Sequence, residues 1–102
     1  MDSGAAFEER MRELREGFVA GLPARLEAMR VALLSDDMPT VQREAHRLAG
    51  TGLSYGLPEL TTWGRAVERK CKAGEPLASL AVDLDELSAL IAGLAHPLDA
   101  VG

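Results

Sequence analysis

The sequence has one cysteine, few aromatic residues and too little positive charge for several classes of function. Cys71 is the only cysteine, so the chain can form no internal disulfide and no cysteine zinc site, and we expect a reducing compartment. Aromatic residues make up 4% of the 102 residues and apolar residues 47%, so aliphatic side chains must form the core. With 16 acidic and 11 basic residues, the chain lacks the basic face that binds nucleic acid.

Long apolar runs are also absent. No run approaches the roughly 20 residues of a membrane-spanning helix, and the charged segment 1–16 lacks the apolar stretch of a signal peptide. We therefore expect a cytoplasmic protein with no membrane partner. The length predicts one domain over residues 1–102, and an end soon after the last predicted helix favours a free-standing protein.

Helical periodicity is present from end to end. Along the N-terminal third, apolar residues recur at steps of three and four, at positions 7, 11, 14, 18, 22, 26, 29 and 33. Pro23 interrupts this stripe, so it either kinks one long helix or begins a second one. Of these alternatives we favour two helical segments with a bend near residues 21–23.

Three further helices follow, each beginning at or beside a proline. We predict them over residues 39–55, 58–73 and 76–96. In the last helix, leucines and one isoleucine form a regular seam at positions 77, 80, 84, 87, 91 and 94. Amphipathic helices with short loops predict an all-α fold, an antiparallel up-down four-helix bundle (about 20–96) with an additional N-terminal helix.

The least ordinary stretch of the sequence surrounds His46. Gly50 and Gly52 follow it within a predicted helix, where each glycine costs roughly 1 kcal/mol relative to alanine. On a helical wheel, His46 and Gly50 point away from the predicted core-facing residues, which are Val41, Ala45, Leu48, Gly52 and Tyr55. We therefore expect an exposed imidazole beside bare backbone and beside the exposed Leu53, open to another protein.

The alternative is that His46 is an ordinary surface residue, as most histidines on helix exteriors are. Ala49, Gly50, Gly52 and Leu53 count against this alternative, because helix propensity and solubility both disfavour such residues on an unused face.

Other residues have simpler interpretations. We expect Cys71 to pack as a small apolar group and Trp63 to lie partly in the core, at its edge. His96 lies near the end of the last helix, where it interacts with the helix dipole. The last helix carries a charged outer face, formed by Asp83, Asp85 and Glu86.

The stretch from Ala45 to Leu60 resembles the signature of histidine-containing phosphotransfer (HPt) domains. After the histidine, that signature has a leucine at +2, a glycine at +4, a second glycine at +10 and a leucine at +14, here Leu48, Gly50, Gly56 and Leu60. Length and helix order agree over nearly the whole chain. The resemblance implies that the aspartyl phosphate of a receiver domain phosphorylates His46, which then passes the group to another receiver domain.

The resemblance also implies roles for the neighbours of this histidine. Gly50 would permit close docking of the receiver domain, and Leu53 and Ala49 would belong to the docking surface. Polar groups of the next helix would face the ring, at the positions of Glu68 and Lys72. An ordinary surface pair at i,i+4 spacing is the alternative for these two residues.

Ala49 departs from the family pattern, because many members carry a lysine three residues after the histidine. The positive charge that balances the phosphoryl group must then come from elsewhere. The candidates are Arg43, Arg47 and Lys72. The alternative for the two arginines is a solvated helix surface.

A neutral imidazole is a nucleophile that needs no base to activate it. The sequence has no phosphate loop of the GxxxxGK[ST] kind, so we expect a phosphoryl carrier without autonomous kinase activity. We expect no cofactor in this chain, since the catalytic aspartate and Mg²⁺ belong to the receiver domain. The expected partners are response regulator receiver domains and a hybrid sensor histidine kinase, bound transiently by a monomer.

A second hypothesis is a non-catalytic docking module, a pseudo-HPt domain that binds receiver or kinase domains without chemistry. Ala49 in place of lysine is the feature that favours it. A helical metal or haem carrier ranks far below, because His46 and His96 have no third and fourth ligand beside them in the sequence.

Overall fold

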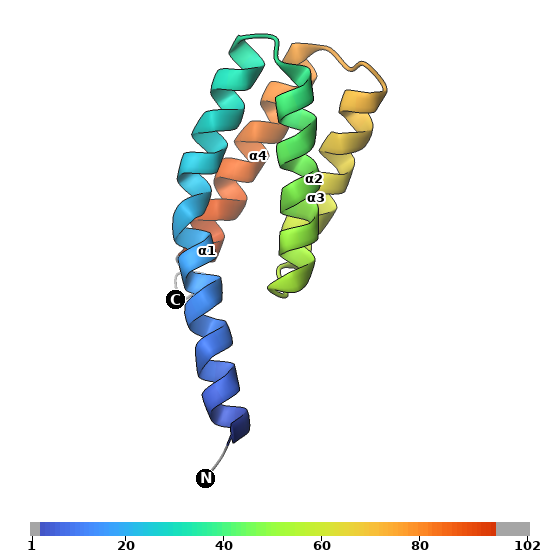
Figure 1. The fold of residues 1–102 in the computed structure, drawn as a ribbon. Coiled ribbons are helices and arrows are strands. Elements are labelled where there is room, and N and C mark those ends of the chain that lie inside the picture. The colour runs from blue at the N-terminus through green and yellow to red at the C-terminus, as the bar shows by residue number, and fades with distance from the viewer. Residues whose placement is uncertain (1–2, 96–102) are drawn as a thin grey trace.

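The computed structural model describes residues 3–95, which form four helices joined by short loops. The helices are α1 (Ser3–Leu34), α2 (Met38–Ser54), α3 (Pro58–Lys72) and α4 (Leu77–Ala95). Successive helices run in opposite directions (Figure 1). α1 packs on α2 and α4, and α3 packs on the same two helices from the other side. The predicted antiparallel four-helix bundle is therefore confirmed. No helix within these residues has the length and apolar character needed to cross a membrane.

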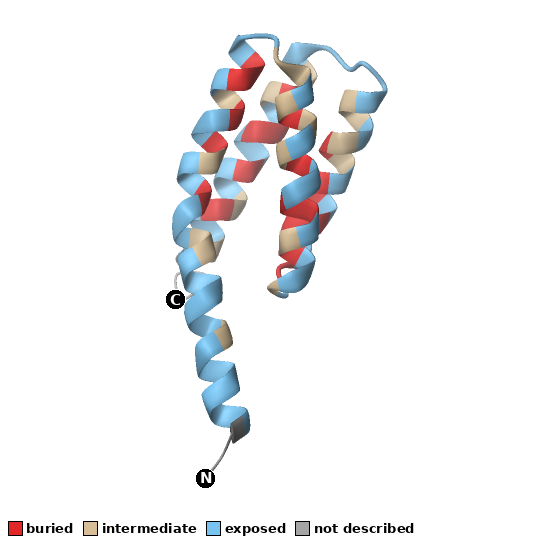
Figure 2. Ribbon diagram, in the orientation of Figure 1, coloured by how far each residue is buried: buried red, intermediate tan, exposed pale blue. Residues whose placement is uncertain are grey.

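The first helix differs from the prediction, because α1 is one continuous helix of 32 residues with Pro23 inside it. The separate N-terminal helix that we expected is the first part of α1. Residues 4–21, here called the α1 arm, include no buried residue, and all but the last turn of the arm extends past the end of the bundle (Figures 1 and 2). In that last turn, Phe18 and Val19 pack against the core. Phe7 and Leu14 are therefore 65% and 49% exposed and do not belong to the core, which begins at Leu22.

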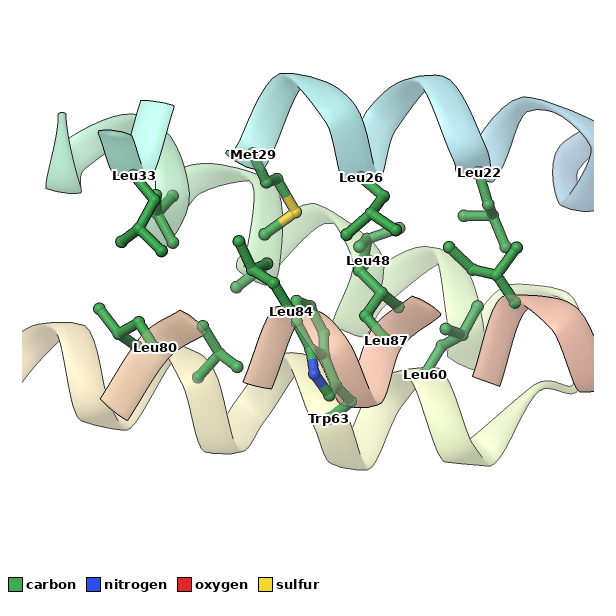
Figure 3. Close-up of a cluster of buried hydrophobic side chains, with 14 of the residues drawn as sticks. Leu22, Leu26, Met29, Leu33, Leu48, Leu60, Trp63, Leu80, Leu84 and Leu87 are labelled. Carbon is green, nitrogen blue, oxygen red and sulfur yellow. The ribbon is translucent and has the colours of Figure 1, made fainter. Parts of the chain in front are cut away.

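Aliphatic side chains from all four helices fill the bundle, as the composition predicts (Figure 3). The largest fully buried side chains are Leu22, Met29, Val41, Leu48, Leu60, Val67, Leu80, Leu84 and Leu87. Within the predicted seam of the last helix, Leu77 is exposed because α4 begins there. The remaining seam residues are buried or half-buried, so the predicted period of this helix is confirmed.

The predicted positions of Trp63 in α3 and Asp83 in α4 are wrong. Trp63 is only 5% exposed, and its Nε1 donates a hydrogen bond to the backbone carbonyl of Asp83 at 2.7 Å, so it lies in the core rather than at its edge. Asp83 is also buried, because its Oδ2 accepts a hydrogen bond from Lys70 Nζ at 2.9 Å. That pairing offsets the cost of removing the carboxylate from water. Asp85 and Glu86 are exposed, as predicted.

Local signals determine where α2 and α3 begin. Asp37 caps α2, accepting hydrogen bonds from the Thr40 amide at 3.2 Å and the Thr40 hydroxyl at 2.6 Å. These bonds lower the pKa of the Asp37 carboxyl. Pro58 occupies the first turn of α3. Gly56, between the two helices, has a φ of 69°, which glycine adopts without the strain that a Cβ would bring.

At two glycines, α2 and α3 approach each other more closely than a Cβ atom at either position would allow. A Cβ at Gly64 would lie 2.5 Å from the carbonyl oxygen of Ala45 and 2.9 Å from the amide nitrogen of Ala49. A Cβ at Gly52 would lie 2.8 Å from Oγ1 of Thr61, which donates a hydrogen bond to the Ala49 carbonyl. Gly52 therefore serves helix packing, as its predicted core-facing position implies, and it does not count as evidence for an accessible outer face.

We predict opposite effects on stability for the same substitution at two glycines. Gly64→Ala should lower the free energy of unfolding by about 2 kcal/mol, because the added methyl group collides with the α2 backbone. Gly50→Ala is the matched control: a Cβ there meets no atom within 4 Å, so better helix propensity should raise stability by roughly 1 kcal/mol. Urea unfolding measures both, and equal changes would contradict the close approach of α2 and α3.

Candidate functional site

α2 presents His46 to solvent. The side chain of His46 is 74% exposed. The residues predicted to face the core around His46 are buried, apart from Tyr55, which follows the end of α2 and is half-buried. One turn after the histidine, Gly50 is exposed with open space around it, and Leu53 is 67% exposed. The prediction of an exposed ring on a face that also carries bare backbone and one exposed apolar side chain is therefore confirmed.

Glu68 of α3 reaches the ring from the neighbouring helix. Its Oε2 lies 3.0 Å from Nδ1 of His46, within hydrogen-bond distance, and its side chain is only 19% exposed. A neutral imidazole that donates its Nδ1 proton to a carboxylate keeps the lone pair on Nε2. In that tautomer the contact leaves Nε2 as the ring nitrogen with a free lone pair, and it restrains the ring's orientation.

Lys72 extends this pair into a cluster of three charged groups. Its Nζ lies 3.6 Å from Oε2 of Glu68, one turn away on α3. The hydrogen bond from His46 lowers the pKa of the Glu68 carboxyl; partial burial opposes this shift, and the charges of His46 and Lys72 add to it. Glu68 and Lys72 form the i,i+4 pair of the alternative interpretation, and the same carboxylate also contacts the histidine.

An open hollow of about 470 Å³ lies against the ring, lined by Met38, Pro39, Gln42, Arg43, His46 and Glu68. The first three of these residues were not predicted from the sequence. Helical periodicity contains a signal for two of them, because Pro39 and Gln42 precede His46 by seven and four residues and so share its face.

The two candidate arginines lie in different places. Arg43 lines the hollow, and its Nη2 donates a hydrogen bond to Oγ1 of Thr40 at 3.3 Å. Arg47 is paired with Glu44 instead, with Nη1 and Oε2 3.1 Å apart, and does not line the hollow. Of the three candidate cations, Arg43 and Lys72 therefore lie close to the histidine site.

Ala49 does not lie where the resemblance implied. It is 7% exposed and faces α3 at the position where Gly64 lets the two helices approach. The expectation that its side chain belongs to the docking surface is therefore wrong, because that side chain points into the helix contact. Gly50 and Leu53 remain on the exposed face.

Other groups with possible chemistry contribute little to this site. Within residues 3–95, no three His, Cys, Asp or Glu residues are arranged to hold a metal ion. Cys71 is half-buried against the core, as predicted, and burial raises the pKa of its thiol, which keeps it protonated. His96, predicted to contact the helix dipole, lies outside the described residues.

Comparison with protein families identifies a match over most of the chain. The family model described as "Hpt domain" matches residues 13–97. The matched range includes the whole of α2, α3 and α4, and begins inside the α1 arm. Comparisons with curated proteins and with solved structures give no match.

We predict that His46 controls the titration of Glu68. In a carbon-13 NMR titration, the pKa of the Glu68 carboxyl should lie below its ordinary value and should return towards it in His46→Ala, which removes the hydrogen-bond donor. The lowered pKa of Asp37 depends on Thr40 and should not change, which makes it the internal control.

This titration has a consequence for stability. Because the Glu68 pKa is lower in the folded chain than in the unfolded chain, the ionised carboxylate stabilises the fold above the unfolded pKa. The contribution is lost as pH falls through the folded pKa. A Glu68 titration that is the same in the wild type and in His46→Ala would show that the hydrogen bond does not form.

Proposed function

Because the chain belongs to the Hpt domain family, whose members transfer phosphoryl groups in two-component signalling, we propose that His46 is its phosphoryl acceptor. Nε2 attacks the phosphorus of an aspartyl phosphate on a receiver domain, and the bond from phosphorus to the aspartate oxygen breaks. The aspartate leaves as a carboxylate, and phosphohistidine remains on this chain. The reverse step passes the group to the aspartate of a second receiver domain.

One observation carries this proposal: an exposed imidazole whose Nδ1 is engaged by Glu68 while Nε2 is left free. As Nε2 bonds to phosphorus, the ring gains positive charge, and a carboxylate hydrogen-bonded to Nδ1 stabilises that charge. Glu68 is thus a positioning residue that acts through the histidine. The rigid α2 backbone supplies the orientation that a transfer between two proteins requires.

The negative charge of the transferred group needs nearby cations, and this chain has alanine at position 49. We assign that role to Arg43, which lines the hollow, and to Lys72, which contacts Glu68. Both side chains are exposed and long enough to move, so they can follow the charge as it arrives. Arg47 is a weaker candidate because it is paired with Glu44.

The docking surface in this proposal is centred on Gly50 and Leu53. Bare backbone at Gly50 lets a receiver domain approach the ring, and Leu53 offers an apolar contact at its edge. The receiver domain supplies the aspartate and its Mg²⁺, so this chain acts as a carrier and needs no nucleotide site or cofactor of its own. Response regulators and a hybrid sensor histidine kinase are the proposed partners.

A non-catalytic docking module is the second candidate function. The buried Ala49 favours it, because the lysine of many family members has no counterpart at that position. Such a module binds receiver or kinase domains whether or not His46 is present.

We predict that His46→Gln abolishes phosphorylation. Incubation with a phosphorylated receiver domain should give the wild type an acid-labile label, whereas the glutamine variant should remain unlabelled because its amide is not a nucleophile. Circular dichroism of the variant should match the wild type, since the side chain is exposed. Equal labelling of both proteins would refute the assignment, and receiver binding without labelling of the wild type would support the docking module.

We predict that a long side chain at position 50 slows transfer. Gly50→Gln should reduce the rate by at least about 10-fold by blocking the approach to the ring, and the fold should remain intact. Gly93→Gln is the matched control, because Gly93 lies on α4 and also has open space around it. If the two variants transfer at the same rate, Gly50 does not serve access.

A further inference from the structure

The α1 arm carries an apolar stripe that the bundle contacts only at its last residue, Phe18. Phe7, Met11 and Leu14 recur at steps of four and three on one face, and Phe7 and Leu14 are largely exposed. Phe18 continues the stripe to the bundle, where its ring stacks on Tyr55 with the ring centroids 5.0 Å apart. Figure 2 shows the arm exposed along almost its whole length.

A helix in this position needs support from outside the bundle. An isolated helical segment of this length is marginally stable in water, because most helical stability in proteins comes from packing of an apolar face. Gly17 and Gly21 weaken the arm further, and a Cβ at either position would meet no atom within 4 Å. The packing of the bundle therefore does not require these glycines, and the bundle contacts only the last turn of the arm, at Phe18 and Val19.

We propose that the stripe is the contact through which two copies of this chain associate, with their α1 arms side by side and antiparallel. The spacing of Phe7, Met11, Leu14 and Phe18 is that of alternating a and d positions in a heptad. In the antiparallel arrangement, Met11 packs against Leu14 of the second copy, and Phe7 packs against Phe18 of the second copy. Phe7, Met11 and Leu14 of each arm then leave water together, next to Phe18, which already packs against the bundle.

The charges beside the stripe select both the partner and the direction. Glu8 and Arg15 follow Phe7 and Leu14 on one flank of the stripe, so an antiparallel pair places each Glu8 opposite an Arg15 of the other copy. A parallel pair would instead bring Arg10, on the other flank, against Arg15 of the second copy, where like charges repel. The same segment is thus complementary to itself in one orientation only.

The remaining charges and the shape of the molecule agree with this arrangement. Glu9, Arg12, Glu13 and Glu16 lie on the opposite face of the arm, where Glu9 and Arg12 already pair with each other. Because the arms project from the bundles, an antiparallel pair places the two bundles at opposite ends (Figure 1). His46 takes no part in the contact, so this inference is independent of the proposed phosphotransfer.

Sedimentation of the full chain over a range of concentrations tests the association. The interface is small, so we expect monomers at low micromolar concentration and dimers as the concentration rises. Leu14→Asp should leave only monomers, while thermal unfolding of the bundle stays unchanged because Leu14 lies outside the core. A wild type that remains monomeric at every concentration, or a Leu14→Asp variant that still dimerises normally, would overturn the proposal.

Charge reversal tests the direction. Glu8→Arg and Arg15→Glu should each weaken the dimer by about 10-fold, and the double variant should restore it, because two attractive pairs form again with reversed sign. Glu16→Arg makes the same change in charge as Glu8→Arg on the outer face and should have no effect. A stronger dimer in Arg15→Glu would show that the arms are parallel.

Cross-linking in a Cys71→Ser background tests the register. When Met11→Cys and Leu14→Cys proteins are mixed in equal amounts, the antiparallel pair brings position 11 of one copy to position 14 of the other. The mixed disulfide should therefore form several times faster than either disulfide between identical variants. Faster formation of the two identical pairs would overturn the antiparallel arrangement.

Discussion

The contact between α2 and α3 at Gly64 determines the geometry on which the candidate site depends. At this point the backbone of α3 lies so close to Ala45 that a single methyl group would collide with it. His46 is the next residue on α2, and Glu68 lies one turn after Gly64 on α3. The carboxylate reaches Nδ1 at 3.0 Å because the two backbones already touch one turn away. A packing requirement in the core thus determines which ring nitrogen keeps its lone pair.

The same contact explains the unusual number of small residues in α2. Ala45, Ala49 and Gly52 all face α3, and Thr61 donates a hydrogen bond across the contact to a backbone carbonyl. Of the alanines and glycines of α2, only Gly50 lies outside this set, with open space around it. Glycines two residues apart in one helix therefore serve different purposes: one lets helices pack, and the other leaves a surface bare.

Much of the fold and part of the site could be predicted from the sequence, because the signals are local. The ends of α2 and α3 follow from Asp37, Gly56 and Pro58, and the exposure of His46 follows from helical periodicity. A helical wheel that assumes a single core-facing direction does not predict the burial of Ala49, because α2 packs against α1 on one side and against α3 on another. The buried arc is wider than a single stripe, and residues beside the stripe are buried as well.

The buried Asp83 and the continuous α1 were not predictable for other reasons. Periodicity assigns a carboxylate to the outer face, and only the tertiary structure supplies the Lys70 amine that allows its burial. Pro23 predicts a break, whereas α1 continues through the proline as one helix. The pairing of His46 with Glu68 came from the family resemblance, since no pattern within one helix reports a contact with another.

The bare backbone at Gly50 also bears on selectivity. A surface of bare backbone excludes few binding partners and selects none, so it suits the proposed transfer of a phosphoryl group between more than one protein. Selectivity between partner proteins must then come from the residues around Gly50, such as Gln42, Arg43 and Leu53, none of which is buried. These positions can change without disturbing the helix packing, so the chain can acquire new binding partners while the proposed phosphoryl acceptor stays the same.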